Sequence, residues 1–363
     1  MHPLFFKMKR TNYRVLCGVV MSAMAVLSGC ATPVGVSRVN EKGVYRQIDG
    51  SALTTNSYSS YTAVVLHRHG LKEDDFLDNP REFVRNLHEI ATYDDRRDLL
   101  LALSELCFLT AIKAKAAEET QPIDNREFFY SYVEPEELFP THKPINPKDF
   151  FLGSAVYAYL FILGPGDEPP PGSFDRRFRL ACDLYNRSIA NYMTFVNGRI
   201  ELGDRILTLP VGNIQITIRT LKLPWDTKEL ETVFPADAFQ VRGLSVRNRV
   251  PGIGAPILAV REKSPGRPVS GAVPATVFVE IKGGGLKDIE NGNCVGEVSI
   301  YSTMSDSEII VNGQKIPLET DLTAPIAYTF NDPILWSLGR NLLRAGRSEF
   351  DPGIYPFSPM NPA

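Results

Sequence analysis

Two histidines flank an arginine at His67-Arg68-His69, and imidazole is the side chain that most readily binds metals or moves protons near neutral pH. In a β-strand, residues two apart point to the same side, which suits a shared metal ion, whereas in a helix the two rings diverge. No neighbouring pair of carboxylates completes a ligand set. A solvated or partly buried polar pair is the default, and the sequence predicts no metal site.

Acidic residues gather at two places, Glu73-Asp74-Asp75 and Asp94-Asp95. Both runs lie at expected helix starts or turns, where carboxylates stabilise the positive end of a helix dipole, so we expect a structural role. A third polar set lies on one predicted helix, where Asp183 and Arg187 are spaced to form a surface ion pair. The alternative is that these two residues and Asn186 dock a neighbouring domain.

Signatures of common catalytic sites are absent from the sequence. It has no G-x-S-x-G nucleophile turn and no P-loop, and His88-Glu89 lacks the second histidine of H-E-x-x-H. The stretch GIGAPI at 252–257 begins like a dinucleotide-binding turn but lacks the third glycine. We therefore assign no catalytic and no cofactor-binding residue, and we lean against an enzyme. The alternative is an enzyme whose site the sequence does not mark, built from His67, His69 and dispersed acids.

Three cysteines follow residue 30, and none belongs to a C-x-x-C pair, which argues against a metal knuckle. They are Cys107, Cys182 and Cys294. An oxidising compartment permits one disulfide, between Cys107 and Cys182 on predicted helices of one domain. Three buried free thiols are the favoured alternative. Trp225 and Trp336 suit core packing or a domain interface.

The first 29 residues have the pattern of a secretory signal peptide. Residues 1–14 carry four cations and no acid, and residues 15–27 are apolar or small but too few to span a bilayer. Leu27-Ser28-Gly29-Cys30 follows and resembles the bacterial lipobox, in which the peptidase cuts before the cysteine and the thiol carries a diacylglyceryl group. Several acyl chains on one residue anchor a protein stably. In the lipoprotein sorting pattern that the sequence resembles, Ala31 after the cysteine implies the outer membrane. The alternative to lipidation is an ordinary signal peptide with an incidental cysteine.

Cleavage before Cys30 would leave 334 residues with 35 cations against 42 acids, a formal charge of −7. This balance offers no basic surface for nucleic acid. The hydrophobic fraction of the whole sequence, 44%, is normal for a globular protein, and the length suggests two domains. The best remaining apolar run, 153–164, is too short to span a membrane.

Residues 61–196 predict an irregular helical domain behind a polar tether at 30–60. Asn79 and Pro80 have the pattern of a helix start. The stretch 149–162 is apolar nearly all round, which predicts a central helix, and GPGDEPPPG at 164–172 ends it. Alanine and tyrosine at the expected helix contacts favour a tetratricopeptide-like αα arrangement, although no clean repeat is present.

At about Asn197 the hydrophobic pattern changes to alternation, and residues 197–330 predict a mainly antiparallel β domain. Ile214, Ile216 and Ile218 alternate in one strand, and Asn312-Gly313 between two apolar runs is a strong two-residue hairpin signal. Residues 331–363 predict a terminal helix and a Pro-rich linker. The expected fold is therefore α+β, with the helical domain first.

Several stretches of the mature chain resemble the N-terminal, non-catalytic region of bacterial lipoproteins that carry an α/β-hydrolase domain of the esterase or lipase kind. They are RRFRLACDLYNRSI (176–189), FPADAFQVRGL (234–244), NRVPGIGAPILA (248–259), SIYSTMSDSEIIVNGQKIPLETDLTAPIAYTF (299–330) and GIYPFSPMNPA (353–363). None of them is a catalytic signature. In that family the Pro-rich segment leads into the hydrolase domain, which this sequence does not reach, so the resemblance carries over no catalytic residue.

Together these patterns predict a lipid-anchored, non-catalytic accessory module associated, in cis or in trans, with a serine α/β-hydrolase domain. Lipidated Cys30 would attach this module to the outer membrane. We expect neither a cofactor nor a nucleic-acid partner. The alternative is an envelope lipoprotein whose helical domain binds another protein.

The size of the native gene product in the membrane fraction tests this prediction. Antibodies against residues 61–196 should detect a band near the mature size if the hydrolase acts in trans. A band larger by a whole domain indicates a hydrolase in cis. A product confined to the soluble fraction would contradict the lipid anchor.

Overall fold

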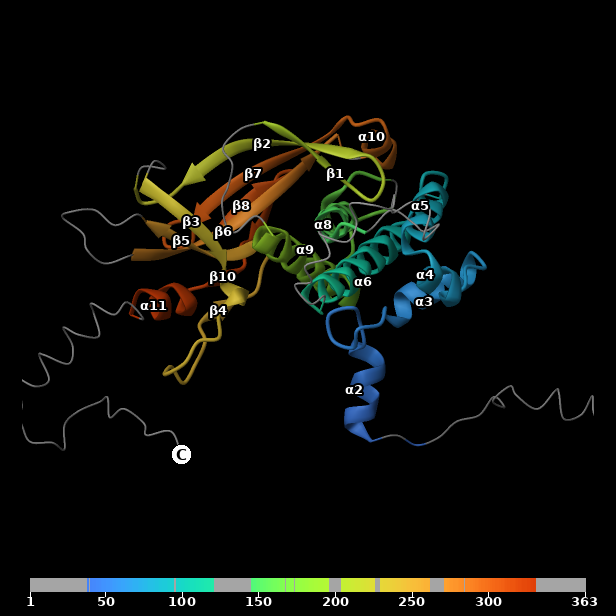
Figure 1. Ribbon diagram of the computed structural model, residues 1–363, viewed down its shortest axis with the longest axis horizontal. Helices are drawn as coiled ribbons and strands as arrows, with labels where there is room; N and C mark the ends of the chain where they lie inside the picture. Colours follow the sequence, from blue (N-terminus) through green and yellow to red (C-terminus); the bar gives the residue numbers. More distant parts are fainter. Residues whose placement is uncertain are drawn as a thin grey trace, which may run out of the picture. The chain divides into compact units, whose positions relative to one another are not determined.

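Figure 1 shows the protein as a computed structural model. The structure describes residues 38, 40–94, 96–120, 145–166, 168–172, 174–195, 204–225, 229–261, 271–283 and 285–330. The predicted signal peptide, Cys30, Asp95, Trp336 and the predicted helix and linker at 331–363 lie outside these residues. By its internal contacts the chain divides into two compact units, Met1–Ile48 and Asp49–Ala363.

The segment predicted as a tether is partly structured. Helix α2 spans Glu41–Asp49, and residues 51–59 belong to the second unit, where Ala52 and Ser59 are buried. A tether that runs to residue 60 therefore differs from the structure. The polar composition at 51–59 had suggested solvation, but these residues pack onto helix α6 (Asp98–Thr120).

A buried carboxylate on α6 organises this segment. Glu105 is fully buried and accepts hydrogen bonds from the backbone N–H groups of Ala52 and Ser59, both at 3.0 Å. The hydroxyls of Ser59 and Thr62 donate to the same carboxylate, both at 2.7 Å. A carboxylate is tolerated in a core only when such donors surround it, so the segment before α3 and Thr62 in the first turn of α3 supply the donors that Glu105 needs.

The helical layer packs around one central helix, α8 (Pro147–Leu163). The layer also contains α6 and the helices α3 (Ser60–Arg68), α4 (Glu73–Asp78), α5 (Pro80–Ala91) and α9 (Arg176–Phe195). The predicted start of α5 is confirmed, since the Asn79 side chain accepts from the Glu82 N–H at 3.2 Å and Pro80 lies in the first turn. Helix α8 is buried along nearly all its length, as predicted, and packs against α6 and α9.

Small hydroxyl residues allow these three helices to approach closely. Ser104 of α6 donates to the Ser154 carbonyl of α8 at 2.9 Å, and Ser188 of α9 donates to the Ser154 hydroxyl at 2.9 Å. All three side chains are buried and hydrogen-bonded, as buried hydroxyls must be. The layer is thus held by specific polar contacts, while a tetratricopeptide-like pairing is not confirmed.

A buried arginine ends α8 at the predicted break. Arg97, only 5% exposed, donates to the carbonyls of Leu160 (3.0 Å), Phe161 (3.2 Å) and Gly164 (2.8 Å). A helix leaves its last carbonyls without intrahelical partners, and a guanidinium has enough donors to serve them. Burial lowers the pKa of Arg97, an effect that the charge of Glu168 opposes.

The strands form a six-stranded sheet in the order β1-β2-β7-β6-β5-β3. They are β1 (Arg205–Thr208), β2 (Asn213–Lys222), β3 (Leu230–Pro235), β5 (Ala255–Arg261), β6 (Gly271–Lys282) and β7 (Cys294–Ser302). Neighbouring strands are antiparallel except β2 and β7, which run parallel. The structure therefore confirms an α+β fold with a mixed sheet, and the predicted mainly antiparallel β domain is not confirmed.

Shorter elements join the strands or cover them. They are η4 (Ala236–Ala238), β4 (Arg249–Val250), α10 (Leu286–Glu290), β8 (Glu308–Val311), β9 (Gln314–Pro317), β10 (Thr320–Asp321) and α11 (Thr323–Phe330). The predicted hairpin is confirmed: β8 and β9 pair around Asn312 and Gly313, whose φ angles are 51° and 77°. Two consecutive positive φ angles are what a type I′ turn requires.

One face of the sheet packs against α8 and α9 (Figure 1). Ile214 and Ile216 are buried there, and Ile216 lies opposite Gly296 of β7, which in turn lies opposite Ile281 of β6. A small apolar cavity of 70 Å³ remains between the layers. Helices and sheet share one hydrophobic core, so the predicted division at residue 197 is a change of layer within one unit, not a domain boundary.

Helix α9 completes the edge of β6. Strand β5 begins at Ala255, opposite Val277, so it offers no partner to Val279. The Tyr185 hydroxyl of α9 takes that place, since it accepts from the Val279 N–H and donates to the Val279 carbonyl, both at 2.8 Å. Buried backbone groups need partners, and the Tyr185 hydroxyl supplies the partner that a neighbouring strand would otherwise supply.

Replacement of Tyr185 by Phe should leave two buried backbone groups without partners. We expect Tyr185→Phe to lower the free energy of unfolding by about 2 kcal/mol or more, as measured by urea denaturation. Tyr93→Phe is the matched control, because Tyr93 is 87% exposed. Equal stability of the two variants would contradict the assigned role of the hydroxyl.

Candidate functional site: an arginine–carboxylate cluster

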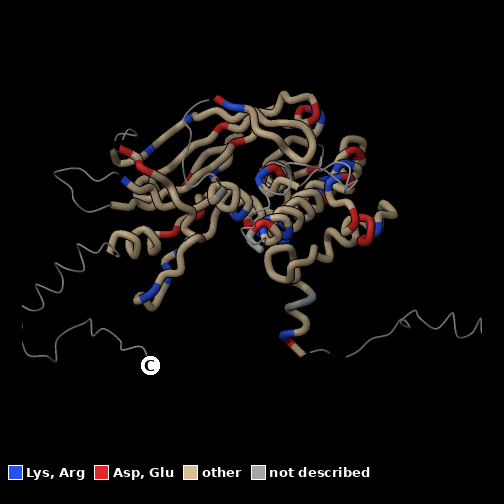
Figure 2. The backbone as a smooth tube through the Cα atoms, viewed as in Figure 1, with Lys and Arg blue, Asp and Glu red and all other residues tan. Residues whose placement is uncertain are grey.

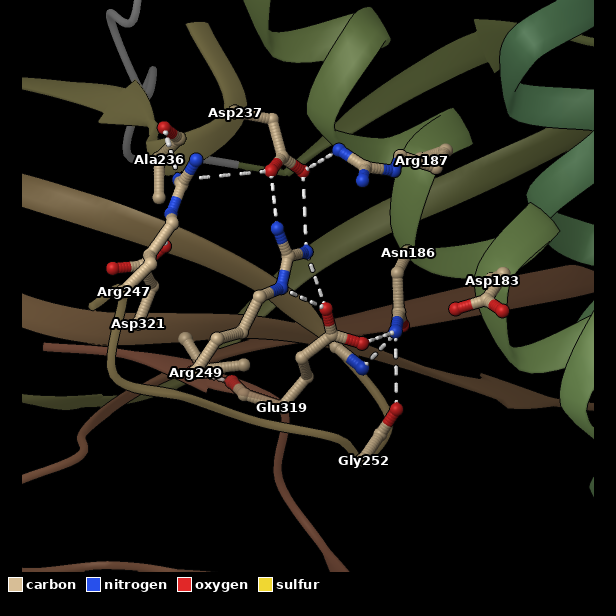
Figure 3. Close-up of polar contacts among 12 residues, drawn as sticks. Asp183, Asn186, Arg187, Ala236, Asp237, Arg247, Arg249, Gly252, Glu319 and Asp321 are labelled. Carbon is tan, nitrogen blue, oxygen red and sulfur yellow. Dashed lines mark hydrogen bonds and ion pairs between the residues drawn. The ribbon is translucent and has the colours of Figure 1, made fainter. Parts of the chain in front are cut away.

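Charged side chains converge where α9 meets the loops at one end of the sheet (Figure 3). We call this group the arginine–carboxylate cluster; its members are Asn186, Arg187, Asp237, Arg247, Arg249, Glu319 and Asp321. Helix α9 contributes the first two, and η4, β4, β10 and their flanking residues contribute the others. Segments separated by more than a hundred residues in the sequence thus meet at one point.

Arg249 lies at the centre of the cluster. Its Nη1 donates to Asp237 Oδ1 at 2.5 Å, and its Nε donates to Glu319 Oε1 at 2.8 Å. Glu319 is only 2% exposed, and its Oε2 also lies 3.7 Å from Arg179 Nη2. Burial disfavours the guanidinium charge, but the hydrogen bond to Asp237 and the charge of Glu319 outweigh it and raise the pKa of Arg249.

Asn186 ties α9 to the chain just before β5. Its Oδ1 accepts from the Gly254 N–H at 2.6 Å, and its Nδ2 donates to the Gly252 carbonyl at 3.0 Å and to Glu319 Oε2 at 2.5 Å. Gly252 lies so close to residues 317–319 that an added Cβ would come within 2.6 Å of their backbone. Only a glycine fits between the two segments at this point.

The remaining carboxylates are also occupied. Asp321 Oδ2 accepts from Arg247 Nε at 2.6 Å, while its Oδ1 accepts from the N–H groups of Thr323 and Ala324 at 3.0 Å and thereby caps α11. Asp237 also pairs with Arg187. Burial raises the pKa of Asp237, but Arg249 and Arg187 outweigh burial and hold it below its usual range.

The predicted surface pair between Asp183 and Arg187 is wrong. Asp183 instead accepts from Arg179, at 3.0 Å from Nε and 2.5 Å from Nη2, and Arg187 reaches Asp237 of the sheet layer. The alternative, that Asn186 and Arg187 dock a neighbouring element, agrees with the structure for these two residues. Arg179 and Arg187 each lie four residues from Asp183, so spacing alone does not say which of them pairs with it. The contact of Arg187 with Asp237 in the sheet layer leaves Arg179 as the partner of Asp183.

The two histidines of the opening motif do not converge. His67 is exposed on α3, and His69 follows the end of that helix, with its Nε2 3.6 Å from Asp94 Oδ2. The hydrogen bond from Arg96 holds the pKa of Asp94 at about 2. Within the described ranges no group of histidine, cysteine and carboxylate side chains is placed to hold a metal ion. The run at 73–75 occupies the first turn of α4, as predicted.

The described cysteines are buried free thiols, the alternative that we favoured. They are Cys107, Cys182 and Cys294. Burial raises the pKa of Cys107, and raises those of Cys182 and Cys294 to about 12, so none is a ready thiolate nucleophile. Trp225 packs against the core, with the Arg261 guanidinium 5.2 Å from its ring centroid.

Sequence reasoning missed a second buried polar group. His88 of α5 is fully buried; its Nδ1 lies 2.8 Å from the Tyr157 hydroxyl of α8. Its Nε2 lies 3.3 Å from Glu290 Oε1 of α10, close enough for charge interaction but poorly aligned for a hydrogen bond. The signal was available, because His88 lies among Val84, Leu87 and Ala91 on the buried side of α5.

An open cleft of 470 Å³ lies where α8 ends near β6 and the β8–β9 hairpin. The guanidinium of Arg97 faces it but is bonded to carbonyls. The carboxylate of Glu280 is bonded to Arg219 and Lys282. The charged groups of this cleft are therefore engaged in structural contacts.

Comparison of the chain with protein-family models, with curated proteins and with solved structures finds no match. The resemblance to hydrolase-associated lipoproteins therefore remains a prediction. Among the described helices, none combines the length and the apolar character needed to cross a membrane.

Removal of the central arginine should destabilise the fold, because the buried carboxylate of Glu319 then keeps only the more distant guanidinium of Arg179, at 3.7 Å. We expect Arg249→Met to cost about 3 kcal/mol in the free energy of unfolding, measured by denaturant titration, and Arg249→Met with Glu319→Gln to cost less. Lys315→Met is the control, since its pair with Glu308 is exposed and such pairs contribute about 0–1 kcal/mol. A single variant as stable as this control would refute the assigned role.

His88 should make stability depend on pH. Burial lowers its pKa below the ordinary 6.5, against the opposing charge of Glu290. Below about pH 6.5 the unfolded chain binds a proton that the folded chain excludes, so stability is full above that pH and falls as pH decreases. We expect His88→Gln to flatten this slope in urea titrations at several pH values, whereas His67→Gln keeps it. Identical slopes for both variants would contradict the burial effect.

Proposed function

We propose that the chain is a lipid-anchored, non-catalytic accessory module of the bacterial envelope that holds an α/β-hydrolase domain, in cis or in trans. The observation that carries the proposal is the saturation of the arginine–carboxylate cluster. Each of its carboxylates is bonded to arginine, asparagine or helix N–H groups. General acid–base and nucleophilic catalysis need a group free to exchange a proton or to attack, whereas a saturated cluster suits a rigid support.

The way in which the arginine–carboxylate cluster joins the helical layer to the sheet also supports the proposal. Bonds from Asn186 and Arg187 link α9 to the sheet loops, and Asp321 links them to α11. The helical layer, which we propose offers a packing surface of the tetratricopeptide kind, and the sheet would then move as one body. The lipobox-like Leu27-Ser28-Gly29-Cys30 and the stretches that resemble hydrolase-bearing lipoproteins supply the membrane anchor and the partner in this proposal.

Affinity capture tests the partner. The tagged mature chain, solubilised from membranes in detergent, should retain a serine hydrolase that reacts with a fluorophosphonate probe, either as a separate protein or within the same polypeptide. Arg249→Met is the matched variant, because it disturbs the cluster while leaving Cys30 intact. Capture of envelope-assembly proteins without a hydrolase would favour the alternative, a lipoprotein that binds other proteins.

An ester-hydrolysis assay tests the enzyme alternative. The purified chain without a partner should hydrolyse short acyl esters no faster than the buffer does. Enzyme-like hydrolysis by this chain, lost in the His67→Ala/His69→Ala double variant, would refute the proposal and establish the unmarked site.

A further inference from the structure

A loop protrudes from the fold between η4 and β4. Residues 242–248 are all exposed, and the aliphatic side chains of Leu244 and Val246 are 50% and 75% exposed. The base of the loop is firmly held: the Asn248 N–H donates to Thr323 Oγ1 at 2.6 Å, and the Leu322 N–H donates to the Asn248 carbonyl at 3.0 Å. The loop therefore presents its apolar tip from a fixed base.

Helix α11 adds apolar surface next to this base. Ala324 and Tyr328 on one side of α11 pack toward the sheet, whereas Ile326 and Phe330 on the opposite side are 49% and 65% exposed. Strands β4 and β10 pair with each other immediately before α11, and in Figure 1 the loop and α11 leave the same side of the sheet. We call Leu244, Val246, Ile326 and Phe330 the apolar tip surface.

The charges around this surface favour an anionic neighbour. Arg242 is exposed on the loop, and no ion pair of Arg242 with another described residue is present. Basic residues along the backbone are blue in Figure 2. The nearby acids are neutralised, since Asp237 and Glu319 pair with Arg249, and Asp321 pairs with Arg247. Within the part of the chain that the structure describes, the surface thus has an exposed arginine beside aliphatic side chains, and the carboxylates of the adjoining cluster are paired with arginine.

We propose that the apolar tip surface inserts into the headgroup region of an anionic lipid bilayer, with Arg242 on lipid phosphates. Aliphatic and aromatic side chains flanked by arginine are typical of interfacial membrane contacts, and basic residues near the surface are attracted to anionic lipid. A convex tip of two aliphatic residues needs no complementary pocket in a bilayer, as it would in a protein. The inference rests on the proposed anchor at Cys30.

A fluorophore at the tip tests this contact. The mature lipidated chain carrying Val246→Cys is labelled with an environment-sensitive dye, which the three buried native thiols do not compete for, and reconstituted into phosphatidylethanolamine–phosphatidylglycerol vesicles. We expect emission to rise about twofold as the dye leaves water, with quenching by spin-labelled lipids. Ile310→Cys on β8, 69% exposed, is the control and should show neither effect. Arg242→Glu should reduce the rise, and vesicles of phosphatidylcholine alone should do the same.

The outcomes separate the inference from the proposed anchor. If the protein floats with the vesicles but the dye at 246 behaves like the dye at 310, the anchor stands and the insertion is refuted. If the protein does not float, titration of the Cys30→Ala chain with the same vesicles still reports on the tip, and an unchanged dye there refutes the insertion. A rise without quenching by spin-labelled lipids means that a protein surface, such as a second copy, covers the tip, and this also overturns the inference.

Discussion

The backbone of β6 extends beyond its neighbour β5, and the polar groups left on that edge must be satisfied inside the core. Tyr185 meets this need at Val279, and the next residue, Asn186, bonds the backbone of Gly252 and Gly254 just before β5. These bonds fix α9 against the sheet. They also place Arg187, one residue further, beside Asp237. The arginine–carboxylate cluster is thereby joined to α9, while Asp321 of the same cluster caps α11.

Local signals in the sequence predicted the elements that depend on local physics. The Asn79-Pro80 start of α5, the all-round apolar α8 and the Asn312-Gly313 turn each reflect a preference of a few adjacent residues. The burial of the three cysteines likewise follows from their apolar surroundings. The structure bears out these features because tertiary contacts did not oppose them.

Features that depend on distant contacts could not be predicted in this way. The parallel pairing of β2 with β7 joins segments that have β3, β4, β5, β6 and other elements between them in the sequence, and alternation in β2 does not specify its neighbour. Arg187 had two possible carboxylates, and only the position of η4 selected Asp237. The polar residues before α3 looked like a solvated tether because their acceptor, Glu105, lies more than forty residues away. In each case the missing information was the three-dimensional neighbour, not the residue's own preference.

The cluster of donors around Glu105 has a mechanical consequence. Tension applied to the chain ahead of Asp49 enters the second unit at Asp49, which accepts from Arg176 of α9, and then at residues 51–59, which bond to Glu105 of α6. The bonds to Arg176 and to Glu105 come before every strand of the sheet in the chain. A pull from that end would therefore load the helical layer before it loads the sheet.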